Sequence, residues 1–381
     1  MAPDLLIRNG RVIDPKNNID EITDIAVKNG KIAIVDHERA NSSNIIDARD
    51  ALVLPGIIDM HAHVYWGATS LGIDGDALAK RSGTTCWLDV GSAGPGNFAG
   101  FRRFIAERNQ TKVRALLHIS FAGIFGFGKE VSVGESDDLR LLNPSVCANI
   151  AKNNPDLIRG IKVRIGRHAS GFNGIAPLDL ALEAADLAGM PLMCHIDFPP
   201  PSIDDVLNKL RPGDVLTHAF RPRPNAPIDG KGAIREAVLA ARERGVLFDI
   251  GHGMGSFSFD VAEQMLEQGF MPDVISSDVH ALCIDGPAFD NLVTMTKFLH
   301  LGMPLPDVVR AVTAAPAAFM GEPNLGHLGA GATADIAILR QIDTPTRLVD
   351  VSGDARISSQ RLDVQAVILD GQLWHDASVA N

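Results

Sequence analysis

The chain has 381 residues, of which 46% are hydrophobic and 21% are charged, and its formal net charge is −11 at neutral pH. These values are typical of a globular protein that buries a sizeable core. The negative charge excludes sequence-independent binding to nucleic acid and to an anionic membrane surface, although a local basic pocket for a small anion remains compatible. The expected partner is therefore a small molecule, and homo-oligomerisation stays open.

No segment approaches the roughly 18 consecutive apolar residues that a membrane span requires. The first residues, MAPDLLIRNGRVID, carry charges where a signal peptide needs an unbroken apolar core. Four scattered cysteines form no CxxC pair, a pattern that fits neither a disulfide framework nor a zinc ribbon; they are Cys86, Cys147, Cys194 and Cys283. We expect a protein of the reducing cytoplasm.

The two ends of the chain read as β-structure. DLLIRNGRVID and IAVKNGKIAIV each place Asn-Gly (Asn9-Gly10, Asn29-Gly30) between apolar runs, and VQAVILDGQLWHD has Asp370-Gly371 in the same position. These dipeptides predict hairpin turns. Because an isolated hairpin is marginal in water, we expect residues 1–54 and 325–381 to form one small β-sandwich domain. The alternative is two separate β-extensions packed on the larger domain.

Between the two ends, residues 55–324 repeat short runs rich in Val, Ile and Leu, several of them followed by helical segments such as 177–189 and 232–245. The eight runs cover 56–63, 84–90, 113–120, 161–166, 191–197, 214–220, 246–253 and 273–280. Near-continuous apolar runs are typical of parallel strands buried on both faces. Eight such units predict an α/β fold, a (β/α)8 TIM barrel. A doubly wound open sheet is the second interpretation, but no Gly-rich phosphate loop follows the first strand.

Six polar side chains fall in these predicted strands, most of them at the carboxyl ends, where TIM barrels carry their chemistry. They are His61, His63, Lys162, His195, His218 and Asp278. His61 and His63 are two residues apart on one strand, so their side chains point to the same face. A single histidine is more often a hydrogen-bonded structural residue than a ligand. Together, however, the six predict a metal site at one end of the barrel.

Lys162 lies inside an apolar run, where an unpaired ammonium is costly to bury. One interpretation is that it pairs with an acid at the strand end. The other is that desolvation and nearby cations depress its pKa, so that the neutral amine takes up CO2 and becomes a carbamate. A carbamate would supply one oxygen to each of two metal ions.

The chain resembles the amidohydrolase superfamily, specifically its dihydroorotase- and hydantoinase-like metallohydrolases and its deacetylases. The resemblance rests on PGIIDMHAH at the entry to the first predicted strand, on the ligand order His-x-His, Lys, His, His, Asp, and on GATADIAIL (331–339). It implies that His61, His63 and Asp278 bind the more buried of two divalent cations. It also implies that His195 and His218 bind the second cation and that carboxylated Lys162 bridges them. Zinc is the expected metal, and manganese, iron or nickel would suit the same ligands.

Two departures from the family pattern narrow the range of expected substrates. Dihydroorotases have an arginine two residues after the second histidine, where this chain has Tyr65. Hydantoinases have a tyrosine shortly after the bridging lysine, where this chain has Arg164, Arg167 and His168. The sequence therefore supports neither of these two activities well.

We therefore predict a hydrolase that cleaves an amide or ester bond by attack of metal-bound hydroxide, with Asp278 moving the proton. Its substrate would be a small acylated compound with a carboxylate, either an N-acyl amino acid or an O-acetyl hydroxy acid. A cyclic amide hydrolase is the alternative, and a non-catalytic scaffold is a third interpretation.

Some residues near the predicted rim are candidates for substrate contact. Arg164 suits a substrate carboxylate, although a structural acid could also be its partner; Tyr65, His252 and His280 are further candidates. Arg221 and Arg223 are predicted to be solvated. The segment FPPP (198–201) is either a pocket wall or a plain connection.

Overall fold

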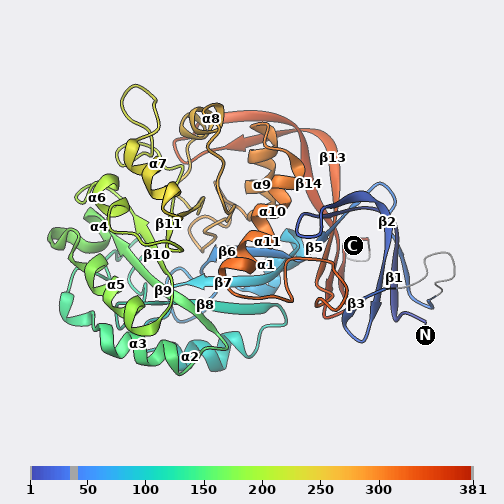
Figure 1. The fold of residues 1–381 in the computed structure, drawn as a ribbon, viewed down its shortest axis with the longest axis horizontal. Helices are drawn as coiled ribbons and strands as arrows, with labels where there is room; N and C mark the ends of the chain where they lie inside the picture. The colour runs from blue at the N-terminus through green and yellow to red at the C-terminus, as the bar shows by residue number, and fades with distance from the viewer. Residues whose placement is uncertain (1, 35–41, 379–381) are drawn as a thin grey trace.

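The computed structural model describes residues 2–34 and 42–378. The terminal residues of the predicted β-domain and the end of its second predicted hairpin (1, 35–41 and 379–381) lie outside the described residues. The fold is α/β, with a parallel sheet surrounded by helices and a separate mixed sheet built from both ends of the chain (Figure 1). Within the described residues, every helix is too short or too polar to cross a lipid bilayer.

The parallel sheet has seven strands, and its strand order follows the chain. The strands are β6 (Ile57–Ala62), β7 (Thr84–Val90), β8 (Lys112–His118), β9 (Ile158–Ile165), β10 (Leu192–Ile196), β11 (Val215–Thr217) and β12 (Leu247–Asp249). Nearly all of their residues are buried, because helices cover one face and the strands enclose the other. Seven of the eight predicted strands are thus confirmed.

The eighth predicted strand, 273–280, is not a regular strand. Val274 makes an isolated parallel bridge to Asp249 of β12, and Val279 makes another to Ala62 of β6. The segment therefore lies between the first and last strands of the sheet. Asp278 has a left-handed backbone conformation (φ 47°), which interrupts the extended chain between the two bridges.

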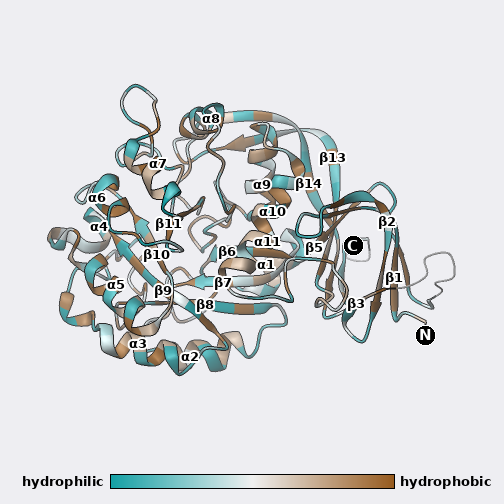
Figure 2. Ribbon diagram, in the orientation of Figure 1, coloured by the Kyte–Doolittle hydropathy of each residue, from teal (hydrophilic) through white to brown (hydrophobic). Residues whose placement is uncertain are grey.

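Helices follow most of the parallel strands. They are α1 (Gly75–Ser82), α2 (Phe98–Phe101), α3 (Pro144–Lys152), α4 (Arg167–Ser170), α5 (Ala176–Ala188), α6 (Ile203–Leu207), α7 (Glu236–Glu243), α8 (Phe259–Glu267), α9 (Asn291–His300), α10 (Leu305–Val312) and α11 (Ala314–Phe319). Figure 2 shows that hydrophobic and hydrophilic stretches alternate along these helices, as expected where one side faces the sheet and the other faces water. Helix α5 matches its prediction, whereas α7 is shorter than predicted.

The mixed sheet joins the two ends of the chain through β5 and β13, which pair antiparallel. Its strands are β1 (Leu5–Asp14), β2 (Ile19–Lys28), β3 (Lys31–Ala33), β4 (Ile45–Asp47), β5 (Leu52–Pro55), β13 (Ile336–Val349), β14 (Ala355–Leu369) and β15 (Gln372–Asp376). Hydrogen bonds connect all eight into one sheet, where we expected a two-layered sandwich. The expected association of the two ends is confirmed.

The three predicted hairpin turns have different outcomes. Asn29-Gly30 joins β2 to β3 and Asp370-Gly371 joins β14 to β15, as predicted. The prediction for Asn9-Gly10 is wrong, because β1 continues through it. The register with β2 shifts between Ile7 and Gly10, and Asn9 has φ 64°, so the dipeptide forms a bulge within one strand.

Strands β13 and β14 extend well beyond the mixed sheet. Only the first residues of β13, 336–339, pair with β5, and the rest pairs with β14 as a two-stranded ribbon. Figure 1 shows this ribbon running from the mixed sheet above α9 toward α8. The C-terminal part of the chain therefore reaches the parallel sheet's side of the molecule.

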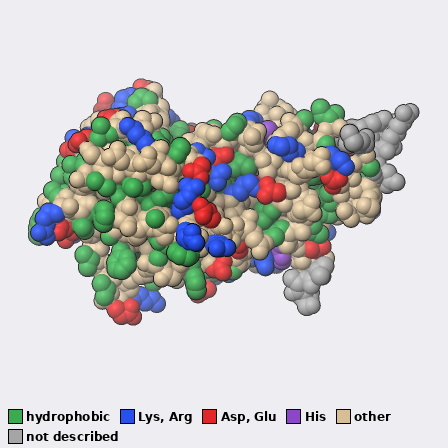
Figure 3. All heavy atoms as spheres, turned by 90° about the horizontal axis from the view of Figure 1, so that it is seen from below, with side chains coloured by type: hydrophobic (Ala, Val, Ile, Leu, Met, Phe, Trp, Pro, Cys, Tyr) green, Lys and Arg blue, Asp and Glu red, His purple; other side chains and the backbone are tan. Residues whose placement is uncertain are grey.

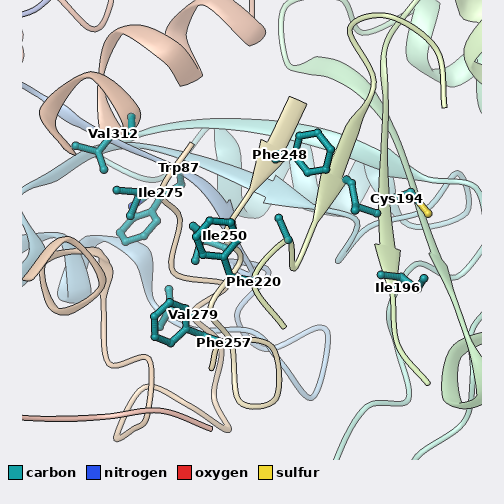
Figure 4. Close-up of a cluster of buried hydrophobic side chains, with 14 of the residues drawn as sticks. Trp87, Cys194, Ile196, Phe220, Phe248, Ile250, Phe257, Ile275, Val279 and Val312 are labelled. Carbon is teal, nitrogen blue, oxygen red and sulfur yellow. The ribbon is translucent and has the colours of Figure 1, made fainter. Parts of the chain in front are cut away.

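Aromatic and aliphatic side chains fill the space between the parallel strands and their helices. Figure 4 shows Phe220, Phe248 and Ile250 within this core, with Phe257 beside Val279. The four cysteines are buried and free, as the scattered spacing predicted. On the face shown in Figure 3, basic and acidic side chains intermingle near the middle and hydrophobic ones are dispersed.

Lys112 at the start of β8 is an ionic link between the two sheets. Its Nζ donates to Asp335 Oδ1 at 3.0 Å and to Asp370 Oδ1 at 2.9 Å, both on the mixed-sheet side. We expect Lys112→Met to lower the free energy of unfolding by about 3 kcal/mol, because it leaves the buried carboxylate of Asp335 unpaired. Thermal unfolding followed by circular dichroism would measure this change, and an unaltered midpoint would show that the link contributes nothing.

Candidate functional site

A cavity of about 320 Å³ opens at the carboxyl ends of the parallel strands, and it is lined by side chains from loops and strands far apart in the sequence. Five of the six predicted metal ligands line it: His61, His63, Lys162, His195 and Asp278. The sixth, His218, does not line the cavity but contacts the rings of His61 and His195. Arg164 and His280 also line it, as the sequence predicted. The cavity is thus the candidate functional site.

His61, His63 and Asp278 meet at one point of the cavity. The Nε2 atoms of both histidines lie 3.2 Å from the same oxygen, Asp278 Oδ1. Burial alone would raise the pKa of Asp278, but the two histidines lower it well below its ordinary value. Ligand atoms of His61, His218 and Asp278 all lie within 4.8 Å of one another, which is close enough to hold one cation.

His195 and His218 form a second pair. His218 Nε2 lies 2.6 Å from His195 Nδ1, and the Nδ1 of His218 must donate to the carbonyl oxygen of Gly251, 2.6 Å away. Burial lowers the pKa of both histidines well below its ordinary value, which favours neutral rings. His218 therefore presents a lone pair to its neighbour, which is the form that binds a metal ion.

A hydrogen bond holds the Nδ1 side of both His61, on β6, and His63, just after β6. His61 Nδ1 lies 2.8 Å from Thr217 Oγ1, and Thr217 donates its own proton to Asp249 Oδ2 at 2.7 Å. Thr217 can therefore accept a proton from His61 Nδ1, and in the neutral ring Nε2 would carry the lone pair. His63 Nδ1 is held in the same way by Ser92 Oγ at 2.9 Å. Such outer hydrogen bonds orient the imidazoles of metal sites.

Lys162 on β9 is completely buried, and its Nζ has no hydrogen-bond partner among the described residues. Burial lowers the pKa of its amine to about 8. The neighbouring Gly91 provides the space for it, since a Cβ there would lie 2.8 Å from Lys162 Cγ. A buried amine without a hydrogen-bond partner is unfavourable. Its conversion to a carbamate, with cations bound to the new oxygens, would remove this cost.

Two of the six residues have strained backbones. His218 and Asp278 adopt left-handed conformations, with φ of 66° and 47°. Non-glycine residues rarely adopt such conformations, which cost of order 1–3 kcal/mol and cluster at functional sites. His218 follows β11 and contacts His195, whereas Asp278 precedes the bridge at Val279 and lines the cavity. These strained conformations lower the stability of the fold at the place where the six side chains meet.

The nitrogen and oxygen donors of this cluster fit a metal ion of the zinc type. Four imidazoles, one buried carboxylate and one amine are packed together, and Lys162 Nζ and His195 Nε2 have no hydrogen-bond partner among the described residues. Histidine nitrogen and carboxylate oxygen are the ligands that zinc and related divalent cations prefer. His61, His63 and Asp278 would hold one ion, His195 and His218 another, with Lys162 beside them.

The structure separates the predicted substrate contacts into two groups. Arg164 and His280 line the cavity, whereas Tyr65 and His252 do not. The hydroxyl of Tyr65 donates to the carbonyl of Asn97 at 3.1 Å, and its ring packs on Phe101 behind the site. His252 is buried, and its Nε2 is bonded to Lys297. Neither side chain can reach a substrate in this arrangement.

Arg164 was predicted either to face a substrate carboxylate or to pair with a structural acid, and its surroundings match both alternatives in part. Its Nη1 lies 3.4 Å from Oε2 of the buried Glu135, and its guanidinium stacks 4.7 Å from the ring of Phe127. Burial alone would raise the pKa of Glu135, but Arg164 and His118 lower it below its ordinary value. The arginine is therefore held by an acid while it still faces the cavity. Glu135 lies in an irregular loop, and no pattern in the sequence pointed to it.

Arg221 is buried and lines the cavity, so the prediction that it is solvated is wrong. It donates to the carbonyl of Ile196 and lies over the ring of Phe198, which also lines the cavity. Arg223 is half exposed and pairs with Asp260, as expected for a solvated arginine. Asp197, which also lines the cavity, was missed, although it directly follows β10 and lies two residues after His195.

Comparison with known proteins identifies relatives along nearly the whole chain. A deacetylase of Brucella anthropi is 32% identical over 357 residues, which are 93% of this chain and 88% of the relative. A crystal structure of an adenine deaminase superposes with a TM-score of 0.90 at 32% identity, covering 98% of this chain and 100% of the other. A dihydroorotase structure gives 0.88 at 30%, covering 98% and 99%. No family model matches the chain.

Thr217→Val tests whether the outer hydrogen bond of His61 serves a metal ion. Valine keeps the shape of threonine but removes the oxygen that accepts from Nδ1, so we expect metal affinity to fall about tenfold to hundredfold. Zinc titration with a competing chelator would measure it. Thr313→Val is the matched control, because it removes a buried threonine hydroxyl bonded to Val309 in α10. Equal affinities in both variants would contradict this assignment.

Proposed function

The chain belongs to the amidohydrolase superfamily, and on that premise we propose that it is a metal-dependent hydrolase that removes an acyl group from a small, carboxylate-bearing compound. The bond cleaved would be the amide of an N-acyl amino acid or the ester of an O-acetyl hydroxy acid. Two divalent cations, zinc first among them, and a carbamate on Lys162 complete the proposed site.

One observation carries the proposal: six candidate metal ligands cluster together, and five of them line a cavity that two arginines also face. The orphaned Nζ of Lys162 and the His195–His218 contact at 2.6 Å support the binding of cations there. Divalent cations, when bound, polarise a carbonyl oxygen and lower the pKa of water toward neutrality. They would also bind lone pairs of the cluster, such as that of His195 Nε2, which has no hydrogen-bond partner among the described residues.

Asp278 is proposed to move the proton. Its carboxylate is buried and ionised, because His61 and His63 hold its pKa well below the ordinary value. It can therefore accept a proton from the attacking water and deliver it to the leaving nitrogen or oxygen. The products would be a carboxylic acid from the acyl group and a free amine or alcohol.

The cavity walls suit a substrate that has both a carboxylate and an apolar part. Arg164 and Arg221 offer planar guanidinium groups, which form paired hydrogen bonds with carboxylates. Leu71, Phe127, Phe198 and Met254 form apolar walls beside them. We propose that Arg164 binds the carboxylate, because Glu135 and Phe127 fix its guanidinium from behind.

The proposal includes the expected domain organisation. Residues 55–324 would form the catalytic (β/α)8 barrel, with 273–280 closing it between β12 and β6. Residues 1–54 and 325–381 would form the small β-domain.

A cyclic amide hydrolase is the second candidate, favoured by the similarity to a dihydroorotase structure along nearly the whole chain. The cavity offers no tyrosine hydroxyl, because Tyr65 is the single tyrosine of the chain and is bonded to Asn97. We therefore place acyl release first.

The experiment compares acyl release with ring opening. Purified protein is assayed with an N-acetyl amino acid, an O-acetyl hydroxy acid, dihydroorotate, a hydantoin and adenine, before and after treatment with EDTA. We expect release of acetate, its loss after chelation and its return with zinc. Turnover of dihydroorotate or adenine alone would overturn the proposed substrate class.

Arg164→Met tests the carboxylate contact in the same assay. Loss of a charge-assisted hydrogen bond is worth about 1.5–3 kcal/mol, so we expect KM for the acetylated acid to rise about tenfold to hundredfold. The matched control is Arg223→Met, which removes an exposed arginine outside the cavity and should leave KM unchanged. If Arg164→Met leaves KM unchanged, or raises it equally for the methyl ester of the substrate, Arg164 does not bind the carboxylate.

A further inference from the structure

Lys297 of α9 is completely buried, yet it has no carboxylate within hydrogen-bond distance among the described residues. Its Nζ lies 2.6 Å from His252 Nε2, 2.7 Å from the carbonyl oxygen of Val349 and 3.0 Å from that of Pro287. An ammonium has three N–H donors, and these three acceptors satisfy all of them. A buried cation with three matched acceptors is a built site and not an accident of packing.

The contact with Lys297 fixes the state of His252. The Nδ1 of His252 lies 2.9 Å from the carbonyl oxygen of Gly253, which can only accept, so Nδ1 carries the proton. Nε2 is then the acceptor for the ammonium. The ring also stacks on Phe257, with centroids 4.8 Å apart, and Phe257 belongs to the buried core (Figure 4). The imidazole is therefore fixed at both nitrogens and on one face.

This fixed ring begins the loop that forms one side of the functional site. Gly253 N donates to the carbonyl of Ser277 at 2.9 Å, and a Cβ on Gly253 would lie 2.2 Å from Asp278 Oδ2. The backbone of Gly253 thus abuts the carboxylate that we assign to proton transfer. The next three residues, 254–256, line the cavity.

The ribbon of β13 and β14 supports the same loop from the other side. Val349 at the end of β13 supplies one acceptor for Lys297, Asp350 Oδ2 accepts from Phe259 N at 3.0 Å, and Val351 N donates to the carbonyl of Phe257. Figure 1 shows how far the ribbon extends from the mixed sheet to reach this place. Lys297 is thus the point where α9, the ribbon and the loop meet.

We propose that Lys297 is a positioning residue for the reaction: through His252 it fixes residues 252–256, which in turn hold the carboxylate of Asp278 and one wall of the cavity. The kinetic test of this inference rests on the proposed function, because it needs a substrate that the protein turns over. Lys297 itself is not expected to contact the substrate. Its effect is expected on the chemical step, since Gly253 abuts Asp278 while Arg164 lies on another wall.

The test uses Lys297→Met, which keeps the length of the side chain and removes its donors. We expect kcat to fall about tenfold to hundredfold, as small misplacements of catalytic groups do, with KM within about twofold of the wild type. The variant His252→Ala and the double variant complete a cycle. Because Lys297 acts through His252, the double variant should be no slower than the slower single variant.

Hydrogen–deuterium exchange provides a readout that needs no substrate. Peptides that span residues 252–258 should exchange faster in Lys297→Met than in the wild type. Lys112→Met is the matched control: it removes a lysine that is hydrogen-bonded between the two sheets, away from the cavity, and should change neither kcat nor exchange in 252–258.

Several outcomes would overturn the inference: kcat of Lys297→Met within twofold of the wild type, independent losses that multiply in the double variant, or unchanged exchange in 252–258. If Lys297→Met does not fold, Lys297→Gln replaces it, because glutamine keeps a donor for His252. The inference then requires a smaller fall in kcat at constant KM. If the wild type releases no acyl group, the proposed function fails, and the exchange experiment alone decides the role of Lys297.

Discussion

The molecule is arranged around one constraint: four imidazoles, a carboxylate and a lysine amine are packed together at the carboxyl ends of the parallel strands. His195 and His218 face each other at 2.6 Å, two histidines share one oxygen of Asp278, and the amine of Lys162 has no partner among the described residues. Polar atoms without a partner, such as Lys162 Nζ and His195 Nε2, are costly to bury. Cations bound at this place would use the lone pairs of the cluster as ligands.

The surrounding structure tolerates strain in order to keep these atoms together. His218 and Asp278 have left-handed backbones, and Gly91 leaves the space that Lys162 occupies. The rings are oriented from outside by Thr217, Ser92 and the carbonyl of Gly251. Farther from the cavity, Lys297 and the ribbon of β13 and β14 contact the loop beside Asp278. The mixed sheet is therefore connected to the site through this ribbon, although none of its described residues lines the cavity.

The sequence predicted those parts of the molecule that follow a repeating pattern. Apolar runs located seven parallel strands, and the polar residues in those runs located the side chains that meet in the cavity. It failed where tertiary contacts decide: Asn9-Gly10 forms a bulge because β1 continues beside β2, and 273–280 makes only bridges because Asp278 leaves the extended conformation. Arg221 was expected in water because loop arginines usually are, yet Phe198 covers it. Glu135 and Lys297 act through contacts between distant segments, for which the sequence holds no local signal.

Anomalous X-ray diffraction at the zinc edge, from crystals grown with zinc and bicarbonate, tests the central claim most directly. We predict two anomalous peaks among His61, His63, His195, His218 and Asp278, with density for a carboxylate on Nζ of Lys162 between them. Zinc bound elsewhere, or an unmodified Lys162 in a cluster without any anomalous peak, would contradict the account.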